Sequence, residues 1–201
     1  MKRLSIIIMV LLLIGCAKVE KYSSIQDKLS KMTSYRTDAE ITYINNNQST
    51  TYTSSIAAKS DGKYRIDISS PKEYTGNVLM YDGKLVWHYN PNIADKKITA
   101  SPPDKASRRE IILFSFLKNY ANSMETTTAV ANIDNNETVE LCAELPDDNI
   151  FGKEKLFVTK VGMLPVKLVI FDKENNERVV VKFSNFDYNS KIEDNEFVIS
   201  S

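Results

Sequence analysis

The feature that most constrains this chain is a two-residue alternation of apolar and polar side chains, which recurs along most of its length. In "AEITYI" (residues 39–44), Ala39, Ile41 and Tyr43 share one side and polar residues lie between them. The stretch "KYRIDIS", from residue 63, repeats the pattern. Such alternation is typical of strands with one face on a core and the other in water, as in antiparallel sheets. We therefore predict a protein dominated by antiparallel strands.

A hairpin is predicted in "NVLMYDGKLVWHYNP" (residues 77–91), where two apolar runs flank Asp82 and Gly83. Glycine supplies the positive φ that tight hairpin turns require. Both faces of these runs are apolar, so we expect a central hairpin that is covered on two sides, and Pro91 should end it. Further strands are predicted at 137–145, at 154–160, in "PVKLVIFD" from Pro165, and in "ERVVVKFSNF" after a turn at Asn175 and Asn176.

A short helix is predicted near the start of the mature chain. Ser24 and Asp27 have the spacing of a capping box, and Ile25, Leu29 and Met32 follow at helical spacing. These three apolar residues should pack on the sheet.

A second helix is predicted over residues 107–120, opened by a capping box of Ser107 and Glu110. Its sequence, "RREIILFSFLKNY" from residue 108, places apolar side chains around most of the helix. We therefore expect it to be buried rather than amphipathic.

These elements together define the expected fold class. A sheet of eight or more strands seldom stays open without curling, and an apolar helix must be enclosed. We predict an α+β fold in which a curved antiparallel sheet forms an unclosed β-barrel with helices packed on its concave face. Residues 24–201 should form a single domain.

The N-terminus has the pattern of a secretory leader. Lys2 and Arg3 precede an apolar run that ends before Lys18, too short for a transmembrane helix. The residues 13–16, Leu-Ile-Gly-Cys, resemble the lipobox of bacterial lipoproteins. This resemblance implies a lipoprotein signal peptide over residues 1–15, attachment of diacylglycerol and palmitate at Cys16, and a membrane tether over residues 16–23. The alternative is an ordinary signal peptide whose cysteine is incidental. Either way, we expect an extracytoplasmic protein.

Charge and residue counts exclude several kinds of function. Without residues 1–15 the 26 basic residues fall to 24 against 26 acidic ones, so we expect no nucleic-acid partner. Only Cys142 then remains, on the polar side of its strand, which leaves no intrachain disulfide and suggests a half-exposed small residue. His88 is the only histidine, whereas metal sites and nucleophile–base pairs draw on several groups. We expect no catalytic residue, metal or cofactor, and no enzyme.

Aromatic residues are a better indication of function. The chain has 10 Tyr, 8 Phe and one Trp, which could line a cavity, fill an ordinary core or anchor a protein partner. The candidate cavity or partner-contact aromatics are Tyr81, Trp87, Tyr89, Phe114 and Phe116. The edges of an unclosed sheet could also pair with a partner or with a second copy, so a homodimer is a further possibility.

Two segments resemble a known fold family. "DGKLVWHYNP" (residues 82–91) and "GMLPVKLVIFDKENNERVVVKFSNFDYNSKIEDNEFVI" (residues 162–199) resemble lipoprotein carrier and receptor proteins of the LolA and LolB type. With the lipobox and the length, the chain is most similar to the clostridial germination lipoproteins of the GerS type. The resemblance implies an unclosed barrel whose helices cover an apolar cavity.

The resemblance also implies a function. GerS-like proteins act in sporulation and germination by binding and activating a CwlD-like zinc enzyme, a spore-cortex N-acetylmuramoyl-L-alanine amidase, so that muramic-δ-lactam can form. We accordingly expect a lipoprotein anchored to a membrane in the forespore or spore envelope, with the amidase as its partner. The alternative is a lipid- or lipoprotein-binding carrier that uses the cavity, although lipidation of the chain itself departs from the carrier pattern.

Overall fold

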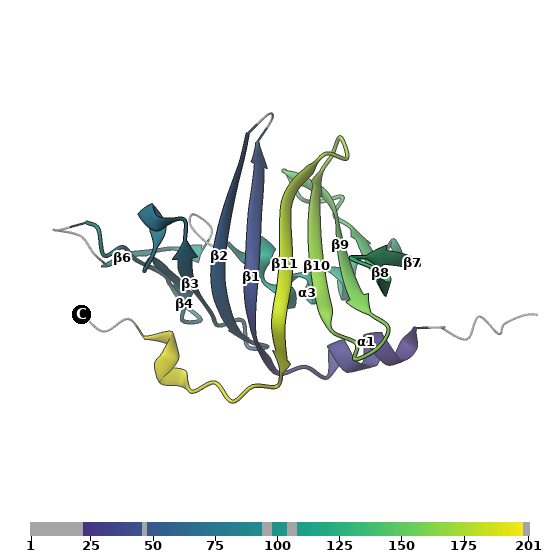
Figure 1. The fold of residues 1–201 in the computed structure, drawn as a ribbon, viewed down its shortest axis with the longest axis horizontal. Helices are drawn as coiled ribbons and strands as arrows, with labels where there is room; N and C mark the ends of the chain where they lie inside the picture. Colours follow the sequence, from purple (N-terminus) through teal and green to yellow (C-terminus); the bar gives the residue numbers. More distant parts are fainter. Residues whose placement is uncertain (1–21, 46–47, 94–97, 104–107, 199–201) are drawn as a thin grey trace, which may run out of the picture.

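The computed structural model describes residues 22–45, 48–93, 98–103 and 108–198. Eleven strands of this part form one sheet (Figure 1). The strands are β1 (Ser34–Asn45), β2 (Gln48–Lys59), β3 (Tyr64–Ser70), β4 (Val78–Tyr81), β5 (Val86–Tyr89), β6 (Ile98–Ser101), β7 (Thr126–Ile133), β8 (Asn136–Glu144), β9 (Phe151–Thr159), β10 (Pro165–Asp172) and β11 (Glu177–Tyr188). The helices are α1 (Ser23–Ser30) and α3 (Leu113–Asn122), with 3₁₀ turns η1 (Lys72–Tyr74), η2 (Arg109–Ile111) and η3 (Asp194–Phe197). No helix in the described residues is long and apolar enough to cross a membrane.

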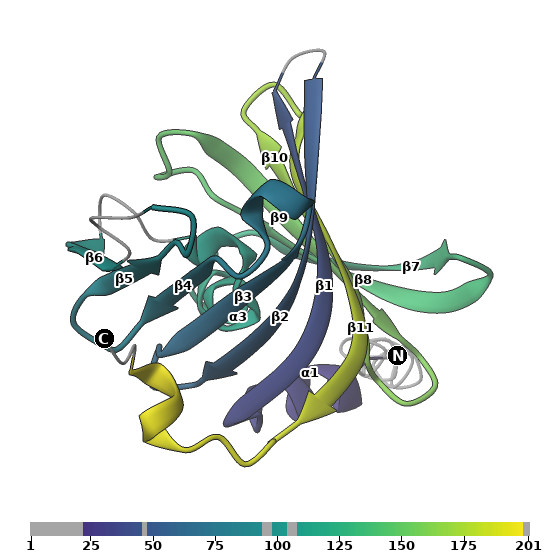
Figure 2. The ribbon, with the colours of Figure 1, turned by 60° about the vertical axis from the view of Figure 1, so that its left-hand side comes forward.

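The sheet is antiparallel throughout and runs in the order β6-β5-β4-β3-β2-β1-β11-β10-β9-β8-β7. Its first and last members do not pair, so the sheet is curved but unclosed. The two halves of the chain meet where β1 pairs with β11, in a register that sets Ile41 opposite Val181. Figure 2 shows the strands bending around α3, which lies on the concave side. The predicted fold class is therefore confirmed, with a single unclosed sheet, α3 on its concave side and α1 at one end of it (Figure 1).

The main core fills this concave side. In β1 the alternation buries Ala39 and Ile41 and leaves Glu40 exposed, as the sequence indicates. The helices contribute Ile25, Leu29, Leu113 and Phe116 to the same apolar cluster. Because one cluster joins both helices to strands from both halves of the sheet, the described chain folds around one core.

The second helix differs from the prediction. Ser107 lies outside the described residues, residues 109–111 form the turn η2, and Ile112 is extended (φ −89°, ψ 123°), so α3 begins only at Leu113. The break lets Ile111 and Ile112 both enter the core. Without them, α3 has an exposed side that includes Lys118, so it is amphipathic and the expected burial all round was wrong. The hydroxyl of Tyr35, rather than a helix residue, accepts the Leu113 N–H at 3.1 Å.

The first helix also starts differently. Ile25, Leu29 and Met32 are buried as predicted. The predicted capping box is wrong, because Tyr22 occupies the cap position and no side chain caps the helix. Asp27 instead pairs with Lys31 at 2.6 Å, one turn further along.

The β4–β5 hairpin is covered on two sides, but not for the expected reason. It lies near one edge of the sheet rather than at its centre. Leu79 and Val86 belong to the main core, whereas Val78 and Met80 belong to a second cluster on the outer face. The chain after β11, with Ile192 and Phe197 of η3, supplies that outer cover.

Candidate functional site

A cavity of about 430 Å³ opens on the concave side of the sheet, between β1–β5 and the segment that leads to α3. This volume falls within the range of small-molecule binding sites. Its walls are formed by Ile41, Tyr43, Thr50, Tyr52, Ile66, Ile68, Tyr74, Asn77, Val78, Leu79, His88, Arg108 and Ile111. Most of these side chains are aliphatic or aromatic, so the cavity suits an apolar group.

Period-two alternation positions the walls. Tyr43 extends the inward side of β1, and Tyr52 of β2 pairs with Ile41, diagonally across from Tyr43. The rings of Tyr43 and Tyr52 meet edge to face with centroids 6.2 Å apart, and Tyr74 of η1 meets Tyr52 in the same way at 5.3 Å. These three rings form a continuous aromatic wall, because edge-to-face contact favours aromatic pairs beyond their buried area.

A cationic group, the side chain of Arg108, lies at the cavity. The Arg108 guanidinium lies 5.0 Å from the Tyr43 ring centroid and 3.8 Å from a carboxylate oxygen of Glu110. Burial raises the pKa of Glu110, and desolvation together with the charge of Arg108 lowers the pKa of His88. Burial also raises the pKa of Tyr43, so its hydroxyl stays neutral. The lining thus combines apolar surface with a guanidinium and a neutral imidazole.

This chemistry can bind a ligand. A guanidinium beside apolar walls can hold a group that has an apolar body and an anionic or polar end. Within the described ranges, no group of three or more His, Cys, Asp or Glu side chains could hold a metal ion. The buried Asn77 Oδ1 accepts no hydrogen bond from any described residue and is a polar contact that an occupant could use.

The five aromatics predicted from the sequence lie outside this lining. Phe116 is fully buried and stacks on Tyr120, and half-buried Phe114 packs near Tyr35. Tyr81 packs on the main core beneath the Arg109 guanidinium, 4.6 Å from its ring centroid.

The remaining two predicted aromatics, Trp87 and Tyr89, lie on the outer cluster next to Phe197. The Trp87 indole N–H donates to Asp82 at 2.7 Å. Both rings are partly exposed, so they remain candidates for contact with a partner.

Sequence reasoning missed the residues that do line the cavity on β2 and beyond. Tyr52 stands in "QSTTYTSSIAAK", a strand in which Thr and Ser replace most apolar residues. The pattern that could have located this strand is the alternation of Tyr52, Ser54, Ile56 and Ala58, which share its inward face. No sequence pattern indicated that Arg108 lines the cavity, because its position depends on the break before α3.

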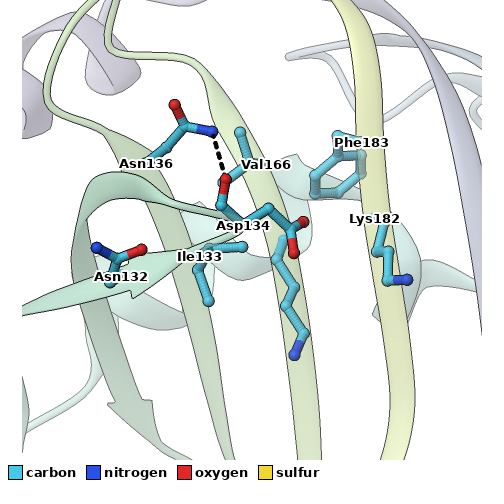
Figure 3. Close-up of a pocket in the computed structure, with 8 residues that line it drawn as sticks. Asn132, Ile133, Asp134, Asn136, Val166, Lys182 and Phe183 are labelled. Atoms are coloured by element: carbon cyan, nitrogen blue, oxygen red, sulfur yellow. Dashed lines mark hydrogen bonds between the residues drawn. The ribbon is translucent and has the colours of Figure 1, made fainter.

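A second hollow, of about 450 Å³, lies between the tip of the β7–β8 hairpin and strands β10 and β11 (Figure 3). It is lined by Asn132, Ile133, Asp134, Asn136, Val166, Lys167, Lys182 and Phe183. Asp134 has a positive φ of 49° in the hairpin turn, and its carbonyl accepts a hydrogen bond from the Asn136 amide at 3.3 Å. This hollow combines apolar side chains with amides, a carboxylate and two lysines, and it adjoins β7, which pairs with one strand only among the described residues.

Cys142 corrects another expectation. It lies on the outer side of β8, opposite Thr127 and Lys155, and is only 6% exposed. A half-exposed position was predicted, but the residue is buried between its cross-strand neighbours Thr127 and Lys155. Burial raises its pKa, which makes it a poor nucleophile.

Comparison with known families identifies the chain. The family described as "Sporulation protein YdcC-like" matches residues 1–197. The chain belongs to the YdcC-like family of sporulation proteins. No curated protein sequence gave a match.

Two solved structures with TM-scores above 0.5 support the fold of this YdcC-like protein. The complex of the CwlD amidase with the GerS lipoprotein from Clostridioides difficile contains a chain that aligns at a TM-score of 0.51 and 26% identity, over 87% of this chain and 97% of that one. An uncharacterized conserved protein from Thermus thermophilus aligns at 0.56 with 13% identity, over 87% and 91%. The LolA superfamily protein NE2245 from Nitrosomonas europaea aligns at 0.47 with 13% identity, over 88% and 97%.

Proposed function

We propose that this YdcC-like protein is a membrane-anchored sporulation lipoprotein that binds and activates a CwlD-like cell-wall amidase. The observation that carries the proposal is the 26% identity over 97% of a chain in the GerS–CwlD complex. Membership of a sporulation family supports a role in the forespore or spore envelope. The cavity adds a binding site whose lining offers a cation and apolar contacts but no nucleophile–base pair.

The proposed anchor lies in the N-terminal part of the sequence. Residues 1–15 would be the leader, Cys16 the lipid-bearing residue and 16–23 the tether. Residues 1–21 lie outside the described part of the chain, and the folded domain is described from Tyr22 onward. Two acyl chains suffice for stable anchoring where one is marginal.

Several surfaces could receive the partner. Trp87 and Tyr89 are partly exposed on the outer face, and β6 and β7 each have an unpaired edge. Strand addition to such an edge would serve for the amidase or for a second copy of this chain. The proposed non-enzymatic role therefore needs no chemistry from this protein.

Amidase turnover tests the proposal. A CwlD-like amidase is mixed with spore-cortex peptidoglycan, with or without the full lipidated chain in detergent, and peptide release is measured. We expect at least a several-fold rise in turnover and a complex of the two proteins in size-exclusion chromatography. Unchanged turnover at saturating concentration would contradict the proposal.

The second candidate function is a lipid- or lipoprotein-binding carrier, and the apolar cavity of about 430 Å³ favours it. Organic extraction of the same purified protein separates the two. One lipid per chain beyond the covalent anchor, with no effect on the amidase, would support the carrier. Absence of such a lipid, with amidase activation, would support the activator.

A further inference from the structure

The turn between β9 and β10 presents apolar side chains to solvent. Val161 is 89% exposed and Leu164 is 37% exposed. Isolated exposed apolar residues are ordinary on protein surfaces, so exposure alone indicates nothing. The turn differs from such isolated residues in its position in the fold and in the hydrogen bonds that hold it.

The turn is held firmly. Gly162 and Met163 both have positive φ, and the Thr159 N–H donates to the Leu164 carbonyl at 2.9 Å. The Lys28 ammonium of α1 donates to the Gly162 carbonyl at 2.8 Å. The Tyr188 hydroxyl donates to the Met163 carbonyl, so elements on two sides fix the turn. Val161 therefore projects from a preorganised loop.

The turn also lies where the tether enters the domain. The Lys160 ammonium, one residue before Val161, is 6.0 Å from the centroid of the Tyr22 ring. Tyr22 is the first described residue. Six residue steps separate it from Cys16, which can span at most about 22 Å whatever their path. A lipid on Cys16 would hold this end of the domain close to a bilayer.

Charges around the turn suit an anionic surface. Lys28 and Lys160 border it, the second paired with Glu137, and Lys31 caps the end of α1 and pairs with Asp27. Basic residues near a bilayer are attracted to anionic headgroups within a Debye length. Apolar side chains flanked by lysines have the composition of an interfacial contact.

We propose that the β9–β10 turn (residues 160–164) is a second membrane contact of the anchored protein, in which Val161 and Leu164 enter the headgroup region of an anionic lipid bilayer. The inference rests on the proposed lipid anchor at Cys16 and adds a fixed orientation to it. A domain attached to the bilayer at one point can tilt freely. Two attachment points at the same end of the sheet hold that end against the bilayer.

The orientation has a consequence for the cavity. The backbone N–H of Asn189, which follows Tyr188, donates to the Ser34 carbonyl at 2.8 Å, so the start of β1 lies at the membrane end. The cavity residues Tyr43 and Thr50 pair at the other end of β1 and β2. Nine residues of strand separate Ser34 from Tyr43, about 30 Å. The cavity residues Tyr43 and Thr50 therefore lie at the end of these strands that is remote from the bilayer.

Site-specific fluorescence tests the orientation. In a Cys142→Ala background, Val161→Cys or Ile150→Cys is labelled with a nitrobenzoxadiazole dye in the full lipidated chain. Ile150 is the matched control, because it is 68% exposed and precedes the opposite end of β9. The proteins are reconstituted on vesicles of phosphatidylcholine with 30% phosphatidylglycerol, with or without headgroup-region spin-labelled lipid. We expect at least threefold stronger quenching at 161 than at 150, and a blue-shifted emission only at 161.

Vesicle flotation separates the failure of this inference from the failure of the anchor. Protein that does not float has no anchor, which overturns both. Protein that floats with equal quenching at 161 and 150 overturns the membrane contact and leaves the anchor intact. A shift at 161 that needs added amidase, or that occurs without lipid as protein concentration rises, would make the turn a protein contact and also overturn the inference. Amidase activation in detergent by Val161→Ser should match the wild type, so that assay remains independent.

Discussion

Glu154 is a carboxyl group buried between α3 and the sheet. It lies on the inward side of β9, is 2% exposed, and accepts a hydrogen bond from the Asn119 side chain at 2.9 Å. Burial raises its pKa to about 7, an increase that the Asn119 hydrogen bond opposes and the nearby Asp148 charge reinforces. No basic side chain is among these influences, and the group is mainly the neutral acid in the folded protein below about pH 7.

The raised pKa predicts pH-dependent stability. A carboxyl whose pKa is higher in the folded than in the unfolded state binds more protons when folded, so the free energy of unfolding falls as pH rises from about 4.5 to about 7. Taken over that interval, the loss is at most about 3 kcal/mol. Glu154→Gln keeps an acceptor for Asn119 and carries no charge. We expect the variant to match the wild type at pH 5 and to be more stable at pH 8, as measured by urea unfolding.

A matched control is Glu137→Gln, at an exposed carboxylate that pairs with Lys160. Its unfolding curve should follow the wild type at both values of pH, because exposed pairs contribute little. If Glu154→Gln and the wild type lost stability in parallel between pH 5 and pH 8, Glu154 would not be the titrating group.

The C-terminal segment after β11 acts as a strap across the outer face of β2–β5. Phe197 is 3% exposed against Val78, Met80 and their neighbours. Asp194 of the same segment contacts Lys59 at 2.8 Å and Lys63 at 3.2 Å. A capping box between Glu193 and Glu196 holds η3 itself. Because the contacts combine burial with several ion pairs, the strap belongs to the folded domain.

Removal of its buried ring should destabilise the domain. Phe197→Ala deletes an aromatic side chain from a closed cluster, a change that typically costs about 3–5 kcal/mol. In urea unfolding we expect the free energy of unfolding to fall by an amount near the lower end of this range, because the strap can move to fill part of the cavity that the ring leaves. Val198→Ala, at a residue that is 58% exposed, is the control and should change stability by less than about 0.5 kcal/mol. Equal losses in both variants would show that the strap is not packed as described.

The elements also show how far sequence patterns predict this fold. Alternation located β1, β3, β8, β10 and β11, because one face of each is apolar and buried. It missed β2, β6 and β7, because β6 is short and the sequences of β2 and β7 are rich in Thr or Ser and carry little apolar signal. β2 pairs with strands on both sides, and β7 pairs with β8 in a hairpin. Backbone hydrogen bonds therefore define these two strands, and their side chains show little apolar pattern.

The candidate site was less predictable than the fold. Its aromatic wall joins Tyr43, Tyr52 and Tyr74 from three elements, and only the first had an evident inward pattern. The placement of Arg108 depends on extended Ile112, which local helix propensity does not indicate. The pairing of β1 with β2 and β11 brings the distant segments of this site together. Local sequence patterns do not predict which strands pair, so they do not predict the site.

For the whole molecule, anchoring and folding should be separable. The buried core includes residues from Ile25 onward, and Tyr22 packs against it. Cys16 and the proposed tether precede these contacts. The sheet closes no ring and needs no covalent link, since the only cysteine after Cys16 is the buried, free Cys142.

Replacement of the anchor should therefore release the protein without unfolding it. In a chain whose residues 1–15 are exchanged for a cleavable secretory leader, Cys16→Ala should leave the membrane fraction and keep the wild-type urea midpoint and circular dichroism spectrum. The β9–β10 turn cannot retain it, because two apolar side chains provide far less burial than two acyl chains, at about 0.8 kcal/mol per buried methylene. Cys142→Ala, in a chain with residues 1–16 unchanged, should stay in the membrane fraction. A Cys16→Ala protein that sedimented with membranes after leader cleavage would show that the attachment lies elsewhere in the domain.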